Sequence, residues 1–320
     1  MNILVTGASG FMARTLISRL CENDGLHVTG LSRKAARWQA ADTSPAKHAF
    51  ATADFMACLA GIDVVVHAAA RAHVLKDEAA DPLAEFRKVN VDFTLNIARQ
   101  AAVSGVKRFI FISTIGVNGT CNDRPFTATD SVAPEEPYAI SKWEAEQGLV
   151  ELCKTNSMEL VIIRPPLMYG PGAPGNFANL VKWVASGIPL PLGAIANQRS
   201  LIGLDNMVDL IATCLDHPAA AGKVLLASDG EDVSTSELLR RVAKAMGKPA
   251  RLIPVPEAVL RAGAAVLGKR AMANRLLGSL RVDISKTTEL LGWTPPFSLD
   301  EGLSRCFKDS AQDTPRVVLK

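Results

Sequence analysis

Short runs of β-branched and other apolar residues alternate with longer amphipathic stretches through the first half of the chain. Strands joined by helices of that length cannot form hairpins, so they predict right-handed crossovers between parallel strands. The sequence therefore predicts an α/β fold with a doubly wound parallel sheet that is covered on both faces. The strand-like runs are Ile3–Thr6, His27–Leu31, Asp63–His67, Arg108–Ser113 and Leu160–Arg164. The helical patterns are Phe11–Cys21, Pro82–Ser104 and Tyr138–Thr155.

The character of the sequence changes after Arg164. Residues 165–191 are rich in proline and glycine, and the patterns that follow are mostly helical, with few strands. We therefore expect a first domain over residues 1–165 and a smaller C-terminal substrate lobe over residues 166–320. The prediction leaves open that some segments of this second half pack with the first domain. The helical candidates are Leu204–Leu215, Ser234–Met246, Pro256–Leu267 and Ser298–Lys308.

Composition and charge exclude several classes of protein. The 35 Lys and Arg against 32 Asp and Glu leave a net charge of +3, which is too balanced to indicate binding to nucleic acid or to an anionic membrane surface. No uninterrupted apolar stretch could span a bilayer, and no leader segment is visible, so we expect no membrane insertion and a cytoplasmic protein. The six cysteines and five histidines are scattered, which predicts reduced thiols and no metal site.

A glycine-rich turn, Thr6–Ala13, separates the first expected strand from the first expected helix. Its spacing, G-x-x-G-x-x-A, is a variant of the dinucleotide-binding turn. Gly7 permits the tight turn, and Gly10 lets backbone N–H groups approach a pyrophosphate at the helix N-terminus. Because the turn follows a strand and opens a helix, it indicates a Rossmann domain that binds a dinucleotide.

The end of the second expected strand bears on the choice of cofactor. NAD-binding domains place an Asp or Glu on the ribose 2′-hydroxyl about 20 residues beyond the turn. Here Ser32 and Arg33 occupy that place, with Lys34 and Arg37 close behind, and no carboxylate is present. A hydroxyl beside several cations suits a 2′-phosphate. We therefore expect NADP(H) as the preferred cofactor, while NAD(H) stays open.

Tyr138 and Lys142 lie four residues apart at the start of an expected helix, so the phenol and the ammonium share one helix face. A neighbouring ammonium favours the phenolate, so we expect the pKa of Tyr138 to fall below its ordinary value of about 10. Ser113 and Thr114 end another expected strand, at the carboxyl edge where open α/β sheets bind ligands. These four side chains indicate proton transfer in a cleft.

Over essentially its whole length the chain resembles the extended short-chain dehydrogenases/reductases, which include nucleotide-sugar epimerases, dehydratases and reductases. The likeness rests on the motifs above and on His67–Ala70, Val89–Val91, Arg164–Gly172 and Leu290–Pro295. It implies that Tyr138 is the catalytic acid or base and that Lys142 holds the nicotinamide ribose. Thr114, with Ser113 as the alternative, would hydrogen-bond the reacting sugar oxygen. The cofactor-binding residues it implies are Gly7, Ser9, Gly10, Phe11, Met12, Ser32, Arg33, Ala68, Ala69, Asn90, Ser113, Tyr138, Lys142 and Pro165.

The resemblance also implies that a nucleoside diphosphate sugar binds to the second lobe. Asn176 matches the segment that covers the nucleoside diphosphate, and Arg199 matches an arginine that grips the diphosphate. Arg275 or Arg281 would supply the second cation, since arginine forks suit phosphate oxygens. Members of this family often dimerise through the helix that carries the tyrosine, and the apolar positions around Trp143 and Leu149 allow a homodimer here.

Departures from the family pattern decide between activities. Thr114 is followed by Ile115-Gly116 where dehydratases carry an Asp-Glu pair, which argues against a dehydratase. The segments His67–Val74 and Ile115–Gly119 resemble bacterial reductases that form UDP-N-acetylquinovosamine. The first hypothesis is therefore an NADPH-dependent reduction of a UDP-4-keto-6-deoxy-N-acetylhexosamine. Two alternatives remain, which are an NAD-dependent UDP-hexose 4-epimerase and a dinucleotide-binding protein without catalysis.

Overall fold

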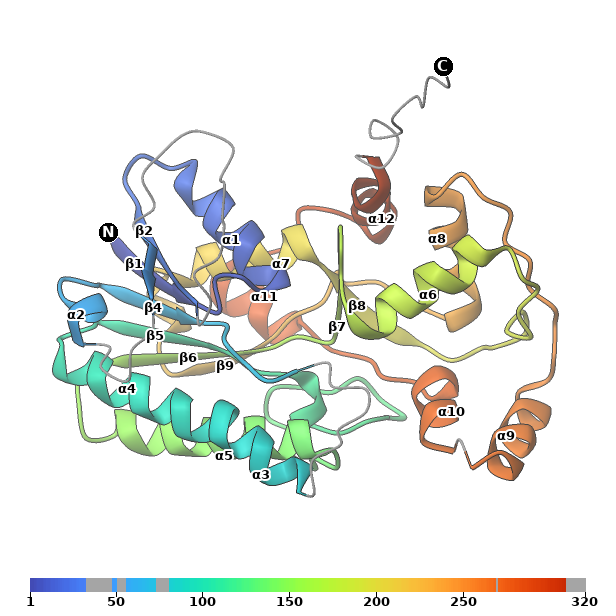
Figure 1. The fold of residues 1–320 in the computed structure, drawn as a ribbon, viewed down its shortest axis with the longest axis horizontal. Helices are drawn as coiled ribbons and strands as arrows, with labels where there is room; N and C mark the ends of the chain where they lie inside the picture. Colours follow the sequence, from blue (N-terminus) through green and yellow to red (C-terminus); the bar gives the residue numbers. More distant parts are fainter. Residues whose placement is uncertain (33–47, 51–55, 73–80, 269, 309–320) are drawn as a thin grey trace, which may run out of the picture.

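The computed structural model describes residues 1–32, 48–50, 56–72, 81–268 and 270–308. In this part of the chain seven parallel strands form one sheet, in the order β3-β2-β1-β4-β5-β6-β9 (Figure 1). The order reverses at β1, which pairs with β2 on one side and with β4 on the other. This confirms the predicted doubly wound parallel sheet. The strands are β1 Asn2–Thr6, β2 His27–Ser32, β3 His48–Phe50, β4 Val64–His67, β5 Arg108–Ile112, β6 Glu159–Arg164 and β9 Lys223–Leu226.

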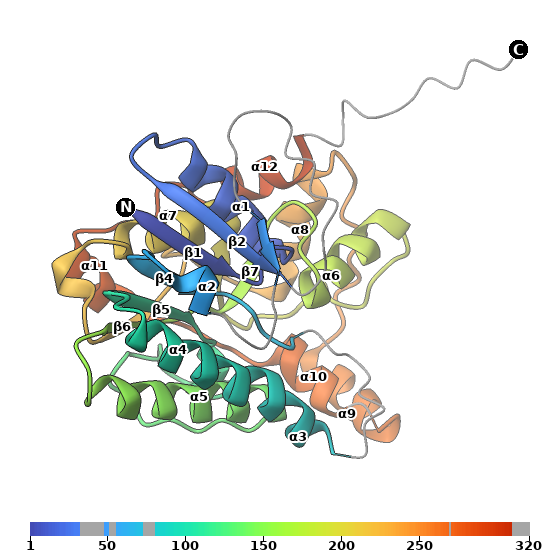
Figure 2. The same ribbon diagram turned by 60° about the vertical axis from the view of Figure 1, so that its left-hand side comes forward.

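Helices cover both faces of this sheet (Figure 2). Ile3 and Val5 of β1 pack into a core with α1, α7 and α11, whereas Leu4 packs into the opposite core with α2, α4 and α5. Both sides of the central strands are therefore buried, which explains why the strands are apolar runs without alternation. The covering helices are α1 Phe11–Cys21, α2 Met56–Leu59, α4 Phe93–Val103, α5 Pro137–Cys153, α7 Leu204–Cys214 and α11 Ser285–Leu291.

The helix expected over Pro82–Ser104 is divided into three parts. An α-helical turn, α3 Pro82–Arg87, is followed by a π-helical segment, Lys88–Asp92, and then by α4. Asp81 caps α3 by accepting a hydrogen bond from the backbone N–H of Ala84. The wider π segment carries Asn90, which is completely buried and whose amide is hydrogen-bonded on both sides. Such segments often occur at functional sites.

A second, smaller unit lies beside the carboxyl end of the sheet (Figure 1). It contains a three-stranded sheet, in the order β10-β8-β7, and a separate apolar core. β9, α7 and α11 come from the second half of the chain but pack with the first sheet. The domain boundary near residue 165 therefore stays a prediction. These three elements follow that boundary in sequence, although they pack with the first sheet. The elements of the second unit are β7 Leu167–Tyr169, α6 Gly175–Ser186, β8 Arg199–Gly203, β10 Asp232–Val233, α8 Thr235–Ala245, α9 Glu257–Val266, α10 Arg270–Leu277 and α12 Leu299–Lys308.

No helix in the described ranges is long and apolar enough to cross a membrane. All six cysteines fall within those ranges and none of them forms a disulfide, as the scattered spacing predicts. Leu149 of α5 is completely buried in the core under this helix, so it is not available to a partner subunit. It therefore gives no support to the expected homodimer.

Gly7 should be far more sensitive to substitution than a glycine of the same backbone conformation elsewhere. Its φ is +71°, and a Cβ there would lie 2.8 Å from the Cα and N of Ala69. Gly61 has a φ of +72° but nothing within 4 Å of its Cβ position. Gly61→Ala should therefore cost about 1 kcal/mol of unfolding free energy from the left-handed backbone alone. Gly7→Ala should cost about 1–3 kcal/mol more, because the backbone after β4 must move.

Urea unfolding of the two variants against the wild type measures this difference. Equal losses for Gly7→Ala and Gly61→Ala would contradict the close approach between the turn and the segment after β4.

Candidate active site

A pocket opens at the carboxyl end of β5 and β6, facing the second unit. Parallel strands end at this edge, so residues far apart in sequence meet there. The pocket brings together many of the residues expected to bind cofactor or substrate. Those among its lining residues are Phe11, Ser113, Thr114, Tyr138, Pro165, Asn176, Arg199 and Arg275.

The glycine turn between β1 and α1 has the shape of an anion-binding loop. Gly10 is the N-cap of α1, and the first turn of the helix has neither a side-chain cap nor an acidic residue. The first backbone N–H groups of α1 therefore face outward with the positive end of the helix dipole. Because Gly7 has no Cβ, the chain after β4 lies in close contact with the turn. The residues present thus fit a pyrophosphate, which is the central group of a dinucleotide.

Polar contacts fix the strand ends around this turn. The ring of His67 is buried between the hydroxyls of Thr6 and Thr94, each 2.9 Å from a ring nitrogen. Burial lowers the pKa of His67 to about 3, so the imidazole is neutral at pH 7. Thr6 also accepts a hydrogen bond from the N–H of Ala69. These contacts hold the expected cofactor residues Ala68 and Ala69 against the turn.

The expected cofactor residues differ in how the structure uses them. Ser32 donates a hydrogen bond to Ser9 at 3.0 Å, which links the end of β2 to the glycine turn. Met12, by contrast, is buried in the core beneath α1. The amide of Asn90 is occupied by the backbone of Arg71 and by the hydroxyl of Ser141, so it fixes the chain beside the site. Arg33, on which the preference for NADP(H) rested, lies outside the described residues, together with Lys34 and Arg37.

Tyr138, Lys142 and Glu146 follow one another at intervals of four residues along α5, and so they share one face. Lys142 is 1% exposed, and its Nζ lies 3.8 Å from the centre of the Phe111 ring. Burial lowers the pKa of Lys142 to about 7, although the charge of Glu146 acts in the opposite direction. Burial also raises the pKa of Tyr138 to about 12. The expected fall in the pKa of this phenol is therefore wrong for the ligand-free protein.

The physical reason is that burial removes water from both groups. The phenolate loses its hydration, and the neighbouring ammonium is itself only partly charged near neutral pH. A lysine that loses its charge this readily contributes little to the stability of a phenolate beside it. The two groups by themselves therefore do not favour proton removal by Tyr138 at neutral pH.

Beneath Lys142 a buried ion pair joins α5 to the sheet. Glu146 and Arg164 are 1% and 3% exposed, and the guanidinium binds both carboxylate oxygens, at 3.0 and 2.5 Å. The hydroxyl of Ser113 donates to the same carboxylate, and Arg164 also donates to Asn118 at 3.0 Å. The Ser113 hydroxyl is therefore engaged with Glu146. This leaves Thr114 as the better-placed hydroxyl for a substrate.

Thr114 is held in place by local structure. It is the N-cap of a short 3-10 helix, Ile115–Val117, and its Oγ1 accepts a hydrogen bond from the N–H of Gly116 at 3.1 Å. The side chain is partly buried and lines the pocket together with Tyr138. Since the hydroxyl hydrogen is not used by that contact, Thr114 can still donate it to an oxygen in the pocket.

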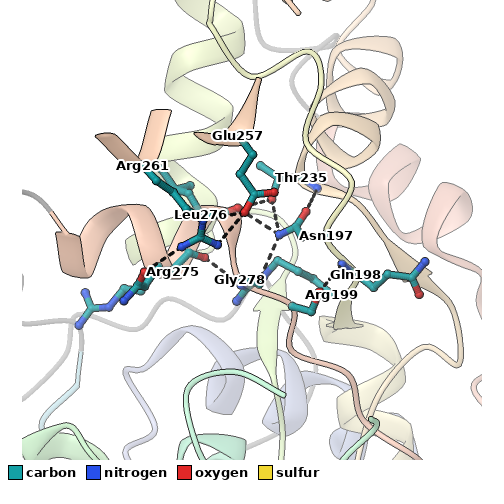
Figure 3. A network of polar contacts seen from close by, with 11 residues as sticks. Asn197, Gln198, Arg199, Thr235, Glu257, Arg261, Arg275, Leu276 and Gly278 are labelled. Atoms are coloured by element: carbon teal, nitrogen blue, oxygen red, sulfur yellow. Dashed lines mark hydrogen bonds and ion pairs between the residues drawn. The ribbon is translucent and has the colours of Figure 1, made fainter. Parts of the chain in front are cut away.

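The three arginines expected to bind a diphosphate lie in different environments. Arg199 uses its Nη1 to bind the carbonyl oxygens of Arg275 and Gly278, at the end of α10 (Figure 3). The side chain of Arg275 binds Glu136. Arg281 donates to the carbonyl of Asp123 and is not among the residues that line the pocket. Of the three arginines, Arg199 and Arg275 line the pocket, and a role for them in diphosphate binding stays a prediction.

Two residues at the site were missed by the sequence analysis. Glu146 could have been found, because it continues the four-residue spacing of Tyr138 and Lys142. Glu136 lines the pocket and pairs with Arg275, which is 139 positions away in sequence. No local pattern in the sequence indicates that contact.

The pKa of Lys142 should make the stability of the protein depend on pH. Between about pH 7 and 8 the unfolded lysine holds a proton that the folded lysine has lost, so stability should rise with pH over that range. At higher pH the unfolded cysteines ionise while Cys214 and Cys306 stay protonated in the fold, which acts in the opposite direction. Lys142→Met should remove this rise, whereas Lys154→Met, at the exposed end of the same helix, should keep it. Urea unfolding at several pH values measures the slope. A full slope in Lys142→Met would show that another group is responsible.

Comparison with known proteins agrees with this geometry. A family model described as the NAD dependent epimerase/dehydratase family matches residues 3–227. UDP-glucose 4-epimerase from Vibrio cholerae is 48% identical over 314 residues, which cover 97% of this chain and 94% of that protein. N-acetyl-alpha-D-glucosaminyl-diphospho-ditrans,octacis-undecaprenol 4-epimerase from Escherichia coli is 30% identical over 320 residues, covering 95% and 93% of the two chains.

Solved structures share the fold over nearly the whole chain. UDP-glucuronic acid 4-epimerase from Bacillus cereus, in complex with NAD, has a TM-score of 0.77 at 23% identity and covers 98% of this chain and 99% of its own. UDP-glucose 4-epimerase from Thermotoga maritima, with UDP-glucose, has the same TM-score and identity and covers 97% and 100%. The solved structures show the shared fold, and the family model and the relative from Vibrio cholerae show that this chain belongs to the NAD dependent epimerase/dehydratase family.

Proposed function

We propose that the chain is an NAD-dependent 4-epimerase that inverts C4 of a hexose carried on uridine diphosphate. The observation that carries this proposal is the 48% identity to UDP-glucose 4-epimerase across 97% of the chain. Tyr138 in the pocket wall supplies the acid-base group that such a reaction needs, and Lys142 lies one turn further along the same helix. The family description names NAD, and the Bacillus cereus structure of the same fold contains it.

The hypothesis of an NADPH-dependent reductase has weaker support. It rested on the cations around Arg33 and on a resemblance to enzymes that form UDP-N-acetylquinovosamine. None of the four relatives named above is a reductase, and the one whose cofactor is stated holds NAD. Chemistry at C4 of a nucleotide-linked sugar is common to both activities, so the site residues keep the same roles.

In the proposed reaction Tyr138 removes the proton from the 4-hydroxyl and later returns it. NAD would supply the acceptor and donor of the hydride at C4. The positive charge of its oxidised form would favour ionisation of Tyr138 and oppose the effect of burial. Thr114 donates a hydrogen bond to the sugar oxygen as charge develops there. Lys142 holds the cofactor ribose, and Arg199 and Arg275 bind the diphosphate.

Inversion requires that the oxidised sugar present both of its faces to the cofactor. Many of the residues that line the pocket are apolar, and these offer no polar contact that would hold the sugar ring in one orientation. The diphosphate, in contrast, has two arginines available, Arg199 of β8 and Arg275 of α10. The proposed site therefore combines arginines that hold the diphosphate with apolar residues that let the sugar ring change orientation. The apolar lining residues are Phe11, Ile115, Ala139, Pro165, Pro166, Leu167, Met168, Pro174 and Leu280.

The use of the cofactor distinguishes the two activities directly. Incubation with UDP-glucose should yield UDP-galactose with only catalytic NAD, and the absorbance of reduced nicotinamide should show no net change. A reductase would instead consume NADPH in proportion to an added UDP-4-keto-6-deoxy-N-acetylhexosamine. Stoichiometric consumption without interconversion of the two UDP-hexoses would overturn the epimerase proposal.

The proton donor can be tested with the two tyrosines of the chain. Tyr138→Phe should lower kcat by at least about 100-fold, because it removes the acid-base group, while NAD affinity stays nearly unchanged. Tyr169→Phe is the matched control, since Tyr169 is buried away from the pocket and donates to Asp229 at 2.7 Å. It should lower stability but keep kcat. Turnover and NAD titration of both variants measure this, and substantial turnover in Tyr138→Phe would exclude the assigned role.

A further inference from the structure

Glu136 and Arg275 form an ion pair at the rim of the candidate active site. The Nε and Nη2 of Arg275 donate to the same carboxylate oxygen of Glu136, at 3.0 and 2.6 Å. Both residues line the pocket. Glu136 immediately precedes α5 on the side of the large sheet, whereas Arg275 belongs to α10 in the second unit. The pair thus connects the two walls between which a ligand would lie.

Glu136 occupies the N-cap position of α5, yet its side chain does not cap the helix. A carboxylate at that place normally accepts a hydrogen bond from a backbone N–H in the first turn and favours the positive end of the helix dipole. Here the carboxylate turns toward Arg275 instead. The contact with Arg275 therefore replaces an interaction that was available locally on α5.

The backbone of α10 is held independently of this pair (Figure 3). The amide of Asn197 donates to the carbonyls of Leu276 and Gly278, at 3.1 and 3.0 Å, and the hydroxyl of Thr235 donates to Leu276 at 2.7 Å. Arg199 binds the same carbonyl of Gly278 and, in addition, the carbonyl of Arg275. Arg275 is therefore fixed at its backbone, and its guanidinium can change partner without movement of α10.

We propose that Glu136 is a built-in competitor for the substrate diphosphate: it holds the guanidinium of Arg275 in the empty enzyme and gives it up when the diphosphate binds. This inference rests on the proposed function, which supplies the diphosphate. The side chains of Glu136 and Arg275 are 40% and 50% exposed, so their pairing is screened by water and weak. Diphosphate oxygens can accept from the same N–H groups and carry more charge.

The competition sets affinity rather than reaction rate. The released carboxylate stays near the bound diphosphate, so its negative charge also opposes binding. Glu136 touches neither the sugar carbon that reacts nor Tyr138 in any described hydrogen bond. It is therefore a positioning residue that should act on KM and Kd while leaving kcat unchanged.

Glu136→Gln keeps the size of the side chain and removes the charge. It should lower the Kd for UDP and the KM for UDP-glucose by about two- to fivefold, which is the range expected from breaking an exposed ion pair. Glu135→Gln removes the same charge from the exposed neighbouring residue, for which no hydrogen bond or ion pair is described, and should leave both constants near the wild-type values. Calorimetric titration of the NAD-loaded protein with UDP, together with steady-state kinetics, measures these constants.

A double substitution tests whether Glu136 acts through Arg275. In an Arg275→Gln background, Glu136→Gln should no longer tighten UDP binding. An unchanged or raised Kd in Glu136→Gln would overturn the proposal, as would an equal gain in Glu135→Gln or a gain that persists without Arg275. The UDP titration does not need turnover, so a protein that binds UDP more tightly after Glu136→Gln but does not epimerise UDP-glucose would refute only the proposed function. A wild type that binds no UDP would refute the competition.

Discussion

The ion pair between Glu146 and Arg164 fixes the helix that carries Tyr138 against the sheet. Burying both charges is unfavourable unless they satisfy each other and their remaining hydrogen bonds. Here two guanidinium nitrogens bind the carboxylate, while Ser113 and Asn118 satisfy further positions. Glu146 lies two turns from Tyr138 on one face of α5. Its ion pair with Arg164 therefore determines how α5 is rotated about its own axis and where it lies along the sheet. The distance of the phenol from the strand edge follows from this contact.

The elements that sequence reasoning predicted correctly are those whose stability comes from local pattern. β1, β2, β4, β5 and β6 all appear within a residue or so of their expected bounds, because strands buried on both faces must be apolar throughout. α1 matches Phe11–Cys21 fully, since it follows a turn with a fixed spacing. β9 was missed because it is four residues long and is a strand only through its pairing with β6. The π segment was missed because a buried amide, that of Asn90, interrupts an otherwise helical pattern.

The same distinction applies to the candidate site. The spacing of Tyr138 and Lys142 predicts their shared face, and the strand ends predict that Thr114 lies near them, because both follow from backbone geometry. Their pKa values did not follow from spacing, since burial outweighs the attraction between two neighbouring groups when one of them loses its charge. The inferred preference for NADP(H) depended on residue types next to β2. A cluster of cations there indicates what could bind a 2′-phosphate but not where the side chains lie.

The proposed reaction places opposite demands on the two ends of its substrate, and the two halves of the chain divide them. Tyr138 and Thr114 come from elements tied to the parallel sheet, where close packing keeps proton-transfer groups in place. Arg199 and Arg275 come from the second unit, where hydrogen bonds to the end of α10 fix the backbone of Arg275 and one nitrogen of the Arg199 guanidinium. A sugar that must turn needs its diphosphate held firmly and its ring held loosely. Polar anchors on one side and an apolar wall on the other provide this combination without any movement of the sheet.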